Sequence, residues 1–558
     1  MAQPSDRPRA SPRWRHDPRL VSYAAIALGA FVRAAHIFSA GFPLSDGGLF
    51  LRMTQDLQAA HYHLPVFTTY NNASIPFAYS PLGFYVAGAV NSVTGISLLQ
   101  LFRFIPLVAT VLTVIAFYYL ARTMLRDERT VAAAVLAFAL LPRSYVWMLM
   151  GGGLTRAAGL LFAIIALQQV YKLYTRREWR YAATAALACA LTVLSHLSTA
   201  NFLAFSIVLF FLFYGRHRFG FLSSVAVAAG AVLLTAPWWG TVVAQHGLAP
   251  FHAARASSGS FFGNVIDRYV VVMRLAHFNT GIGGEALFPL ISVLAVMGAL
   301  ASLRPGRFIL PVWWVLIVVL DARGGMNYAV IPVAMLAGIA VVHVLIPGLR
   351  SLYSGAVSPG QQPRLDAHLD PTMDSAVEQR HSGMARLTRF VPALVLGLLL
   401  LYGLGTSLTR NPDFKGEASF LTALTPSDRT AMQWVAHNTP PTSRFLVVSG
   451  RVWQLDKISE WFPALANRTS VSTVQGSEWL PGFNEGAEAA DAFQARCHAA
   501  DGRCLAQWAD ATGQSFNHVY VPKMPIDPCC TPLIAALRRD PRYIPVYDGP
   551  GAFIAALR

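Results

Sequence analysis

Long apolar runs separated by short basic loops dominate the first 410 residues of the chain. Eleven runs have the length and composition of membrane-spanning helices. They fall near Leu20–Ala40, Phe102–Leu120, Val131–Leu141, Leu154–Val170, Tyr181–Leu194, Phe202–Tyr214, Phe221–Trp238, Ala286–Leu303, Ile309–Leu320, Tyr328–Ile346 and Phe390–Leu404. A shorter apolar segment, Pro81–Val93, contains two glycines, and we expect a re-entrant or interfacial helix there. The pattern predicts a polytopic α-helical membrane protein with about 11 transmembrane helices.

After residue 410 the pattern changes, because apolar runs become short and polar residues come between them. Ser427 is placed to cap a helix through Asp428–Asn438. Runs rich in β-branched and aromatic residues predict strands at Phe445–Ser449, His518–Val521 and Tyr543–Tyr547. Together these elements predict a small water-soluble α/β domain.

Basic residues indicate which side of the membrane each loop faces. The chain has 44 Lys and Arg against 28 Asp and Glu, and residues 410–558 hold 14 of each kind. The net charge of +16 therefore lies in the membrane part, in short loops between apolar runs. This is the distribution of the positive-inside rule, not the basic face of a nucleic-acid-binding protein. Eleven crossings then place the N-terminus in the cytoplasm and the C-terminal α/β domain outside it.

The predicted crossings divide the chain into five parts, and we expect the protein to lie in the plasma (inner) membrane. They are a cytoplasmic basic tail (1–19), a transmembrane domain (20–347) with a first outer loop (41–102), a cytoplasmic linker (348–387), a last transmembrane helix (388–407) and an extracytoplasmic α/β domain (410–558). The linker is rich in Gln, Ser, Pro and charged residues, a composition typical of flexible connections.

Four of the five cysteines, Cys497, Cys504, Cys529 and Cys530, lie in the predicted outer domain, and Cys189 lies inside an apolar run. Thiols outside the cytoplasm commonly form disulfides, so we expect these four to pair, with three pairings open. A zinc site is the weaker alternative, because the spacing contains no C-x-x-C pair.

Acidic residues are scarce in the membrane part, and Asp46 lies in a setting suited to chemistry. It occupies Ser45-Asp46-Gly47-Gly48, after the first predicted span and before the amphipathic stretch Leu49–Ala60. A carboxylate at the membrane surface can act as general base on an acceptor hydroxyl or amine, and the glycines allow close approach. The alternative is a turn in which Asp46 caps the following helix.

Two short segments follow this acid in a suggestive order. Phe77-Ala78-Tyr79-Ser80-Pro81-Leu82-Gly83-Phe84-Tyr85 closes the first outer loop, and Leu101-Phe102-Arg103-Phe104 opens the next span. This arrangement resembles the GT-C superfamily of membrane glycosyltransferases, which includes protein O-mannosyltransferases and lipid A aminoarabinose transferases. Ser80 stands where that family has a proline.

The C-terminal part contains Asn438-Thr439-Pro440, Ser459-Glu460-Trp461-Phe462-Pro463 and Gln475-Gly476-Ser477-Glu478-Trp479. These segments are similar to uncharacterised bacterial and archaeal membrane proteins grouped with the GT-C superfamily. The two Glu-Trp pairs, at 460–461 and 478–479, either line a glycan-facing surface or pack as ordinary partly buried residues.

The GT-C resemblance implies inverting transfer of a hexose or pentose from a polyprenyl-phosphate donor to an extracytoplasmic lipid, glycan or protein. By motif position, Asp46 corresponds to the catalytic base. The leaving phosphate needs cations at the outer ends of spans. The first candidate is Arg323, whose alternative is pairing with Asp321. The others are Arg103, Arg143, Arg156 and His196, for which lipid-interface or capping roles are the alternatives.

No residues are predicted as metal ligands, and a divalent cation stays an open alternative without a motif to support it. The chain has no D-x-D motif to support a catalytic divalent cation, and the spacing of His61 and His63 does not suit two ligands on one helix face. Two other classes of function stay open. A transporter would need charges buried in several spans, and few are present. A non-catalytic scaffold would use the outer domain to bind a partner.

Overall fold

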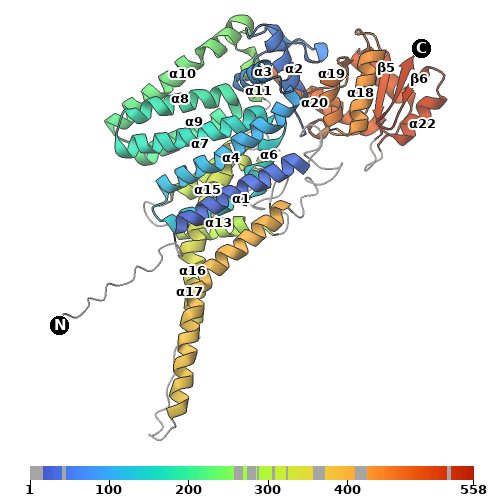
Figure 1. Cartoon of the computed structure of the whole chain (residues 1–558). Helices are drawn as coiled ribbons and strands as arrows, with labels where there is room; N and C mark the ends of the chain where they lie inside the picture. Colours follow the sequence, from blue (N-terminus) through green and yellow to red (C-terminus); the bar gives the residue numbers. More distant parts are fainter. Residues whose placement is uncertain are drawn as a thin grey trace.

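The computed structural model describes residues 17–39, 45–256, 268–269, 271–272, 285, 288–303, 308–321, 324–355, 371–408, 424–523 and 529–558. For 353–355 and 371–389 it describes the helical backbone alone. A helical part and a smaller sheet-containing part lie side by side, and the sheet lies near the end of the bundle that carries α2 and α3 (Figure 1).

Apolar helices account for most of the helical part. Among the described residues, seven are long and apolar enough to span a membrane. They are α1 (Pro18–Ser39), α4 (Leu98–Met124), α7 (Gly153–Arg176), α9 (Leu197–Phe210) with η4 (Phe211–Gly215), α10 (Arg218–His246), α15 (Gly325–Ala340) with η5 (Val341–Leu345) and α16 (Ile346–Gly355), and the second half of α17 (Pro371–Leu408). An eighth is a bent pair in which α5 (Glu128–Leu140) meets η3 (Pro142–Ser144) and α6 (Val146–Leu149) at 81°.

Four further apolar helices are shorter: α3 (Leu82–Thr94), α8 (Arg180–Ser195), α13 (Leu290–Ala301) and α14 (Ile309–Leu320). Three of them, α8, α13 and α14, coincide with predicted spans. The polytopic membrane fold is confirmed, and the count of eleven crossings stays a prediction. The helix predicted at Pro81–Val93 is α3. A short helix, α11 (Ala249–Ala256), follows α10.

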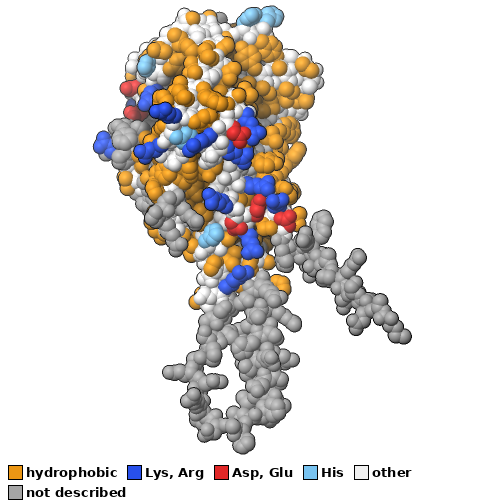
Figure 2. Space-filling model, turned by 90° about the vertical axis from the view of Figure 1, so that its left-hand side faces the viewer, with side chains coloured by type: hydrophobic (Ala, Val, Ile, Leu, Met, Phe, Trp, Pro, Cys, Tyr) orange, Lys and Arg blue, Asp and Glu red, His pale blue; other side chains and the backbone are white. Residues whose placement is uncertain are grey.

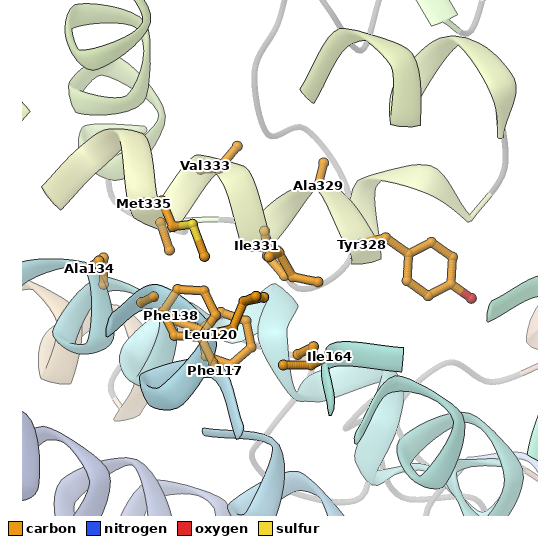
Figure 3. Close-up of a cluster of buried hydrophobic side chains, with 14 of the residues drawn as sticks. Phe117, Leu120, Ala134, Phe138, Ile164, Tyr328, Ala329, Ile331, Val333 and Met335 are labelled. Atoms are coloured by element: carbon orange, nitrogen blue, oxygen red, sulfur yellow. The ribbon is translucent and has the colours of Figure 1, made fainter. Parts of the chain in front are cut away.

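Tight aromatic and aliphatic packing holds the bundle together. Helix α15 lies across α4, α5 and α7, and its Ile331 and Met335 point toward their side chains (Figure 3). The rings of Phe117 and Phe138 stack at 4.1 Å between centroids. The outer surface is also apolar, as Figure 2 shows for one face, and this is expected of a surface in contact with lipid. On α10 the exposed large apolar side chains are Phe221, Leu222, Val225, Val232, Leu233, Leu234 and Trp239.

The first loop is compact. After α1 it forms α2 (Gly48–Ala59), the antiparallel pair β1 (Phe67–Thr68) and β2 (Ile75–Pro76) with η2 (Tyr70–Asn72) between them, and then α3. The Asp56 carboxylate accepts hydrogen bonds from the Thr68 and Thr69 hydroxyls and from the Thr69 N–H, which ties α2 to this small sheet.

The C-terminal domain contains a five-stranded sheet in the order β4-β3-β5-β7-β6. Its strands are β3 (Arg444–Val447), β4 (Thr469–Ser470), β5 (His518–Pro522), β6 (Tyr543–Asp548) and β7 (Ala552–Leu557). β3 is parallel to β4 and β5, whereas β7 is antiparallel to β5 and β6. The predicted α/β domain is confirmed, but the sequence prediction missed β4 and β7.

The predicted helix cap in this domain is wrong by two residues. Helix α18 (Pro426–Asn438) is capped by Thr425, whose hydroxyl accepts the Asp428 N–H at 3.2 Å while the Asp428 carboxylate accepts the Thr425 N–H at 2.8 Å. This reciprocal capping box, with Pro426 at the first helical position, places Ser427 inside the helix.

The two faces of the sheet pack against different partners. On one face, helices α18 and α19 (Lys457–Leu465) join the first loop in one apolar cluster, the shared core, which includes Leu49, Phe84, Phe445, Val447, Trp461 and Tyr520. On the other face, α20 (Phe483–Cys497), α21 (Gly502–Thr512) and α22 (Thr531–Arg539) enclose the distal core, which includes Leu446, Val448, Phe493, Cys497, Cys504 and Val519. The remaining described turns are η7 (Trp453–Leu455) and η8 (Ser477–Trp479).

Candidate active site

Asp46 lies in a sharp turn between α1 and α2. Ser45 has φ 58° and Gly47 has φ 131°, and both values are in the region that most side chains avoid. Trp461 from the C-terminal domain donates its indole N–H to the Ser45 carbonyl at 2.8 Å. The turn is therefore held by a residue more than 400 positions later in the chain.

The Asp46 carboxylate binds the start of α7. It accepts the Gly152 N–H at 2.9 Å, and the Arg156 guanidinium Nη2 donates to both carboxylate oxygens, at 3.0 and 2.8 Å. The alternative prediction, in which Asp46 caps α2, is wrong, because the N-cap residue of α2 is Gly47 and the Asp46 carboxylate is directed to α7. The Gly152 N–H and the Arg156 guanidinium therefore fix the orientation of the Asp46 side chain. The Asp46 side chain is 28% exposed and that of Arg156 is 10% exposed, so solvent still reaches the pair.

Glycines allow the two loops to approach. A side chain on Gly151 would lie 1.9 Å from the Asp46 carbonyl oxygen, and one on Gly152 would lie 2.8 Å from the Asp46 carboxylate. The Gly151-Gly152-Gly153 run therefore brings the backbone of α7 against the Asp46 turn, and larger residues would separate them.

The Arg156 guanidinium has aromatic support. It lies over the Trp147 ring, 4.7 Å from its centroid. Trp147 belongs to α6, which follows the bend after α5 and packs against α7. A guanidinium held between an indole and a carboxylate presents its remaining N–H groups in a fixed direction.

Glu460, on α19, caps α2 from the other side of the site. Its Oε1 accepts the N–H groups of Gly47 at 2.7 Å and Gly48 at 3.1 Å. The Tyr70 hydroxyl donates to the Glu460 carbonyl at 2.7 Å. The first N–H groups of a helix have no partners within it, so this carboxyl group supplies the hydrogen-bond acceptor that they lack.

Glu460 and Glu478, two half-buried carboxyl groups of the C-terminal domain, carry raised pKa values. Burial, followed by the neighbouring Asp46 carboxylate, raises the pKa of Glu460 to about 8. Burial raises the pKa of Glu478 to about 7. The raised pKa values favour the protonated forms of Glu460 and Glu478, which lessens the negative charge around the Asp46 turn.

The segment Phe77–Tyr85 packs beside the site, where Tyr79 lies near Arg156 and Asp46. The Ser80 hydroxyl donates to the Val193 carbonyl at the end of α8, at 2.8 Å. Tyr79 packs edge-on against Trp479, with 5.4 Å between ring centroids, and burial raises its pKa well above the usual range. The two Glu-Trp pairs of the C-terminal domain therefore face the first loop.

Among the predicted phosphate-binding residues, the structure brings Arg156 to Asp46. His196, in the turn between α8 and α9, packs beside Gly159 one turn further along α7. Burial and the nearby Arg156 lower the pKa of His196 to about 3, so its imidazole is neutral. It accepts the Thr199 N–H and caps α9.

The other basic candidates are placed differently. Arg103 donates to the Ile37 carbonyl at 2.5 Å, at the end of α1. Arg143 is buried in the bend after α5. Arg323 lies outside the described residues, although Asp321 is described and its carboxylate accepts the Gly324 N–H at 2.6 Å.

The described residues contain no group of three or more His, Cys, Asp and Glu that could hold a metal ion. In the C-terminal domain the structure joins Cys497 to Cys504 and Cys529 to Cys530. The first of these disulfides belongs to the distal core, away from the shared core that surrounds the Asp46 turn.

Two features of the structure were not predicted. The link from Glu460 and Trp461 to the Asp46 turn joins residues far apart in the chain, and their Glu-Trp motif was the single signal. The second feature is Arg33, fully buried in α1, which donates to the Gly29 and Ala139 carbonyls and the Ser144 hydroxyl and lies over the Tyr145 ring. Its partners on α5 and η3 show that it holds the bend that precedes Trp147.

Solved membrane enzymes share this architecture. ArnT from Cupriavidus metallidurans, bound to undecaprenyl phosphate, superposes with a TM-score of 0.55 over 96% of this chain and 97% of its own, at 15% identity. The chain has the GT-C fold.

Other structures with the GT-C fold also superpose on this chain. The archaeal oligosaccharyltransferase AglB from Archaeoglobus fulgidus, in complex with an inhibitory peptide and a dolichol-phosphate, gives 0.55 over 90% of this chain and 69% of its own, at 13% identity.

A third GT-C structure, the mycobacterial arabinofuranosyltransferase AftD, gives a TM-score of 0.54 over 97% of this chain and 42% of its own, at 17% identity. No protein-family model and no curated protein matches the sequence. At these low identities the GT-C likeness concerns the fold, and the function has to be argued from the site.

Proposed function

We propose that this protein is a membrane glycosyltransferase that moves a sugar from a polyprenyl-phosphate donor to an acceptor, with Asp46 as general base. The observation that carries the proposal is the solvent-accessible Asp46 carboxylate, fixed by Gly152 and Arg156 at the start of α7. Two GT-C neighbours were solved with undecaprenyl phosphate and a dolichol-phosphate.

The proposed reaction is a single displacement with inversion. The acceptor hydroxyl attacks the anomeric carbon, and the bond from that carbon to the phosphate oxygen breaks. Asp46 takes the proton of the acceptor, and the electron pair of the broken bond leaves on the polyprenyl phosphate. Arg156 and the N-terminus of α7 provide positive charge where the leaving phosphate gains negative charge.

We further propose that the site opens on the extracytoplasmic side. Arg19 and Arg122 both contact Glu128, at 3.5 and 2.9 Å, so the start of α1, the end of α4 and the start of α5 lie together. This basic end of the bundle is opposite the Asp46 turn, which follows the end of α1. By the positive-inside rule it faces the cytoplasm.

The test uses the full-length protein in nanodiscs with a panel of undecaprenyl-phosphate hexoses and pentoses, and release of undecaprenyl phosphate is measured. We expect Asp46→Asn to lower kcat about 100-fold or more, the usual contribution of a general base. Asp510→Asn, at an exposed position of α21, is the matched control and should keep wild-type activity.

Full activity of a correctly inserted Asp46→Asn protein would remove Asp46 from the proposal. Absence of turnover by the wild type across the panel would instead favour the non-catalytic scaffold. A second arm with a chelator addresses the metal. A catalytic divalent cation stays an open alternative that no D-x-D motif supports, and loss of turnover after chelation would show that the reaction needs one.

A further inference from the structure

The C-terminal domain contacts the Asp46 turn directly, through two consecutive residues of α19. Glu460 accepts the Gly47 and Gly48 N–H groups, and Trp461 donates to the Ser45 carbonyl. The four residues Ser45–Gly48 are thus held on both sides of Asp46. The positive φ of Ser45, a residue with a side chain, is costly to maintain unless its surroundings fix it.

Helix α19 is itself anchored firmly. Asp456 caps it by accepting the Ser459 N–H at 2.9 Å, and the same carboxylate accepts the Ser449 and Ser459 hydroxyls at 2.5 and 2.6 Å. Ser449 follows β3 in the sheet. The sheet therefore sets the position of α19, and α19 in turn sets the positions of Glu460 and Trp461.

The contact has no room for substitution on the loop side. A side chain on Gly48 would lie 2.5 Å from the Glu460 carbonyl oxygen, and one on Gly47 would lie 3.4 Å from the Trp461 ring. Neighbouring contacts extend the junction. Arg52 donates to the Asn467 side chain at 2.6 Å, and the Asn71 side chain exchanges two hydrogen bonds with the Ser470 backbone, at 2.9 and 2.7 Å.

We propose that Glu460 and Trp461 are positioning residues that hold the Asp46 turn in its catalytic geometry, so that the C-terminal domain is part of the active site. The catalytic meaning rests on the proposed function, whereas the structural clamp does not. A misplacement of about 1 Å can cost two orders of magnitude in rate. The hydrogen bonds of Glu460 and Trp461 to the Asp46 turn therefore control turnover by fixing the position of the Asp46 carboxylate.

The first experiment needs no substrate. Hydrogen–deuterium exchange of the full-length protein in nanodiscs follows the amides of the peptide that contains Gly47 and Gly48. Glu460→Ala should speed their exchange about tenfold, the size expected for loss of a buried hydrogen bond. Glu460→Gln keeps an acceptor oxygen and should exchange like the wild type. Glu488→Ala, at an exposed position of α20, is the matched control.

The second experiment measures turnover of the undecaprenyl-phosphate sugar. We expect Glu460→Ala to lower kcat about 10- to 100-fold with little change in KM, and Glu460→Gln to restore it. Trp461→Phe keeps an aromatic side chain but replaces the indole with a smaller ring that has no N–H, and it should lower kcat by a smaller factor. A merely structural role would lower the amount of folded protein and leave kcat unchanged.

Unchanged exchange at Gly47 and Gly48 in Glu460→Ala would overturn the clamp. Faster exchange with unchanged kcat would overturn the positioning role. An inactive wild-type protein would overturn the proposed function, and the exchange experiment would still decide whether Glu460 holds the turn.

Discussion

The two faces of the C-terminal sheet differ in what they stabilise. Neighbouring residues of β3 and Val448, which follows it, alternate between them: Phe445 and Val447 enter the shared core with the first loop, and Leu446 and Val448 enter the distal core. The shared core reaches the Asp46 turn through α19, whereas the distal core is closed within the domain and contains the Cys497–Cys504 disulfide. One face thus serves the site, and the other serves the stability of the domain.

Alanine substitutions at two adjacent positions give the largest expected contrast. Phe445 packs against the tilted ring of Phe462, beside Trp461, with 5.1 Å between ring centroids. Phe445→Ala should cost about 3–5 kcal/mol and Leu446→Ala about 2–5 kcal/mol, because both leave cavities. Thermal unfolding measures this loss, and exchange at Gly47 and Gly48 distinguishes the faces.

We expect faster exchange at these glycines in Phe445→Ala and wild-type exchange in Leu446→Ala at a temperature where both proteins are folded. Equal exchange in the two variants would show that the faces do not act separately.

The disulfide tests the distal face alone. Cys497 and Cys504 are separated by seven positions, and closing a loop of this size stabilises a domain by about 2–3 kcal/mol. The Cys497→Ser/Cys504→Ser variant should therefore unfold at lower temperature with unchanged kcat. A fall in kcat in folded protein would contradict the division between the faces.

The pH dependence tests the shared face. The pKa of Glu460 is raised to about 8 and that of Glu478 to about 7, from a usual value near 4.5. A raised pKa means that the folded state binds the proton more tightly, so this stability is full below pH 4.5 and is lost as pH rises through about 7 to 8. Burial, Asp46 and Glu478 raise the pKa of Glu460, and the hydrogen bonds from the Gly47 and Gly48 N–H groups oppose this rise in part.

The midpoint of thermal unfolding should therefore fall between pH 5 and pH 8.5 in the wild type. Glu460→Gln should show a shallower fall, because it removes one of the two titrating groups. A wild-type profile that is flat over this range, or one that rises with pH, would exclude the proposed protonation of the shared face.

Much of the membrane fold follows from the sequence, because a bilayer requires about 20 apolar residues per helical crossing and leaves long apolar runs. The shorter helices α8, α13 and α14 are less certain spans for the same reason. In the C-terminal domain, β4 has two residues and β7 lies in an Ala-rich stretch, so neither gives a strong strand pattern.

The site was predicted in part. Asp46 stood out as a rare acid between glycines, and Arg156 was one of several arginines near span ends. Their pairing needed the bend of α5 and α6, which no local pattern shows. Glu460 contacts Gly47 across 413 positions, and Arg33 is one basic residue in an apolar run whose partners come from α5 and η3. These contacts depend on tertiary structure.

The central claim is that a lipid phosphate binds at Arg156 beside Asp46, at a site that the C-terminal domain completes. The most direct measurement is a cryo-electron microscopy structure of the full-length protein in nanodiscs with undecaprenyl phosphate. We predict phosphate density within hydrogen-bonding distance of the Arg156 guanidinium, with Glu460 still bound to Gly47 and Gly48. Phosphate density elsewhere, with Asp46 and Arg156 unchanged and far from it, would contradict the account.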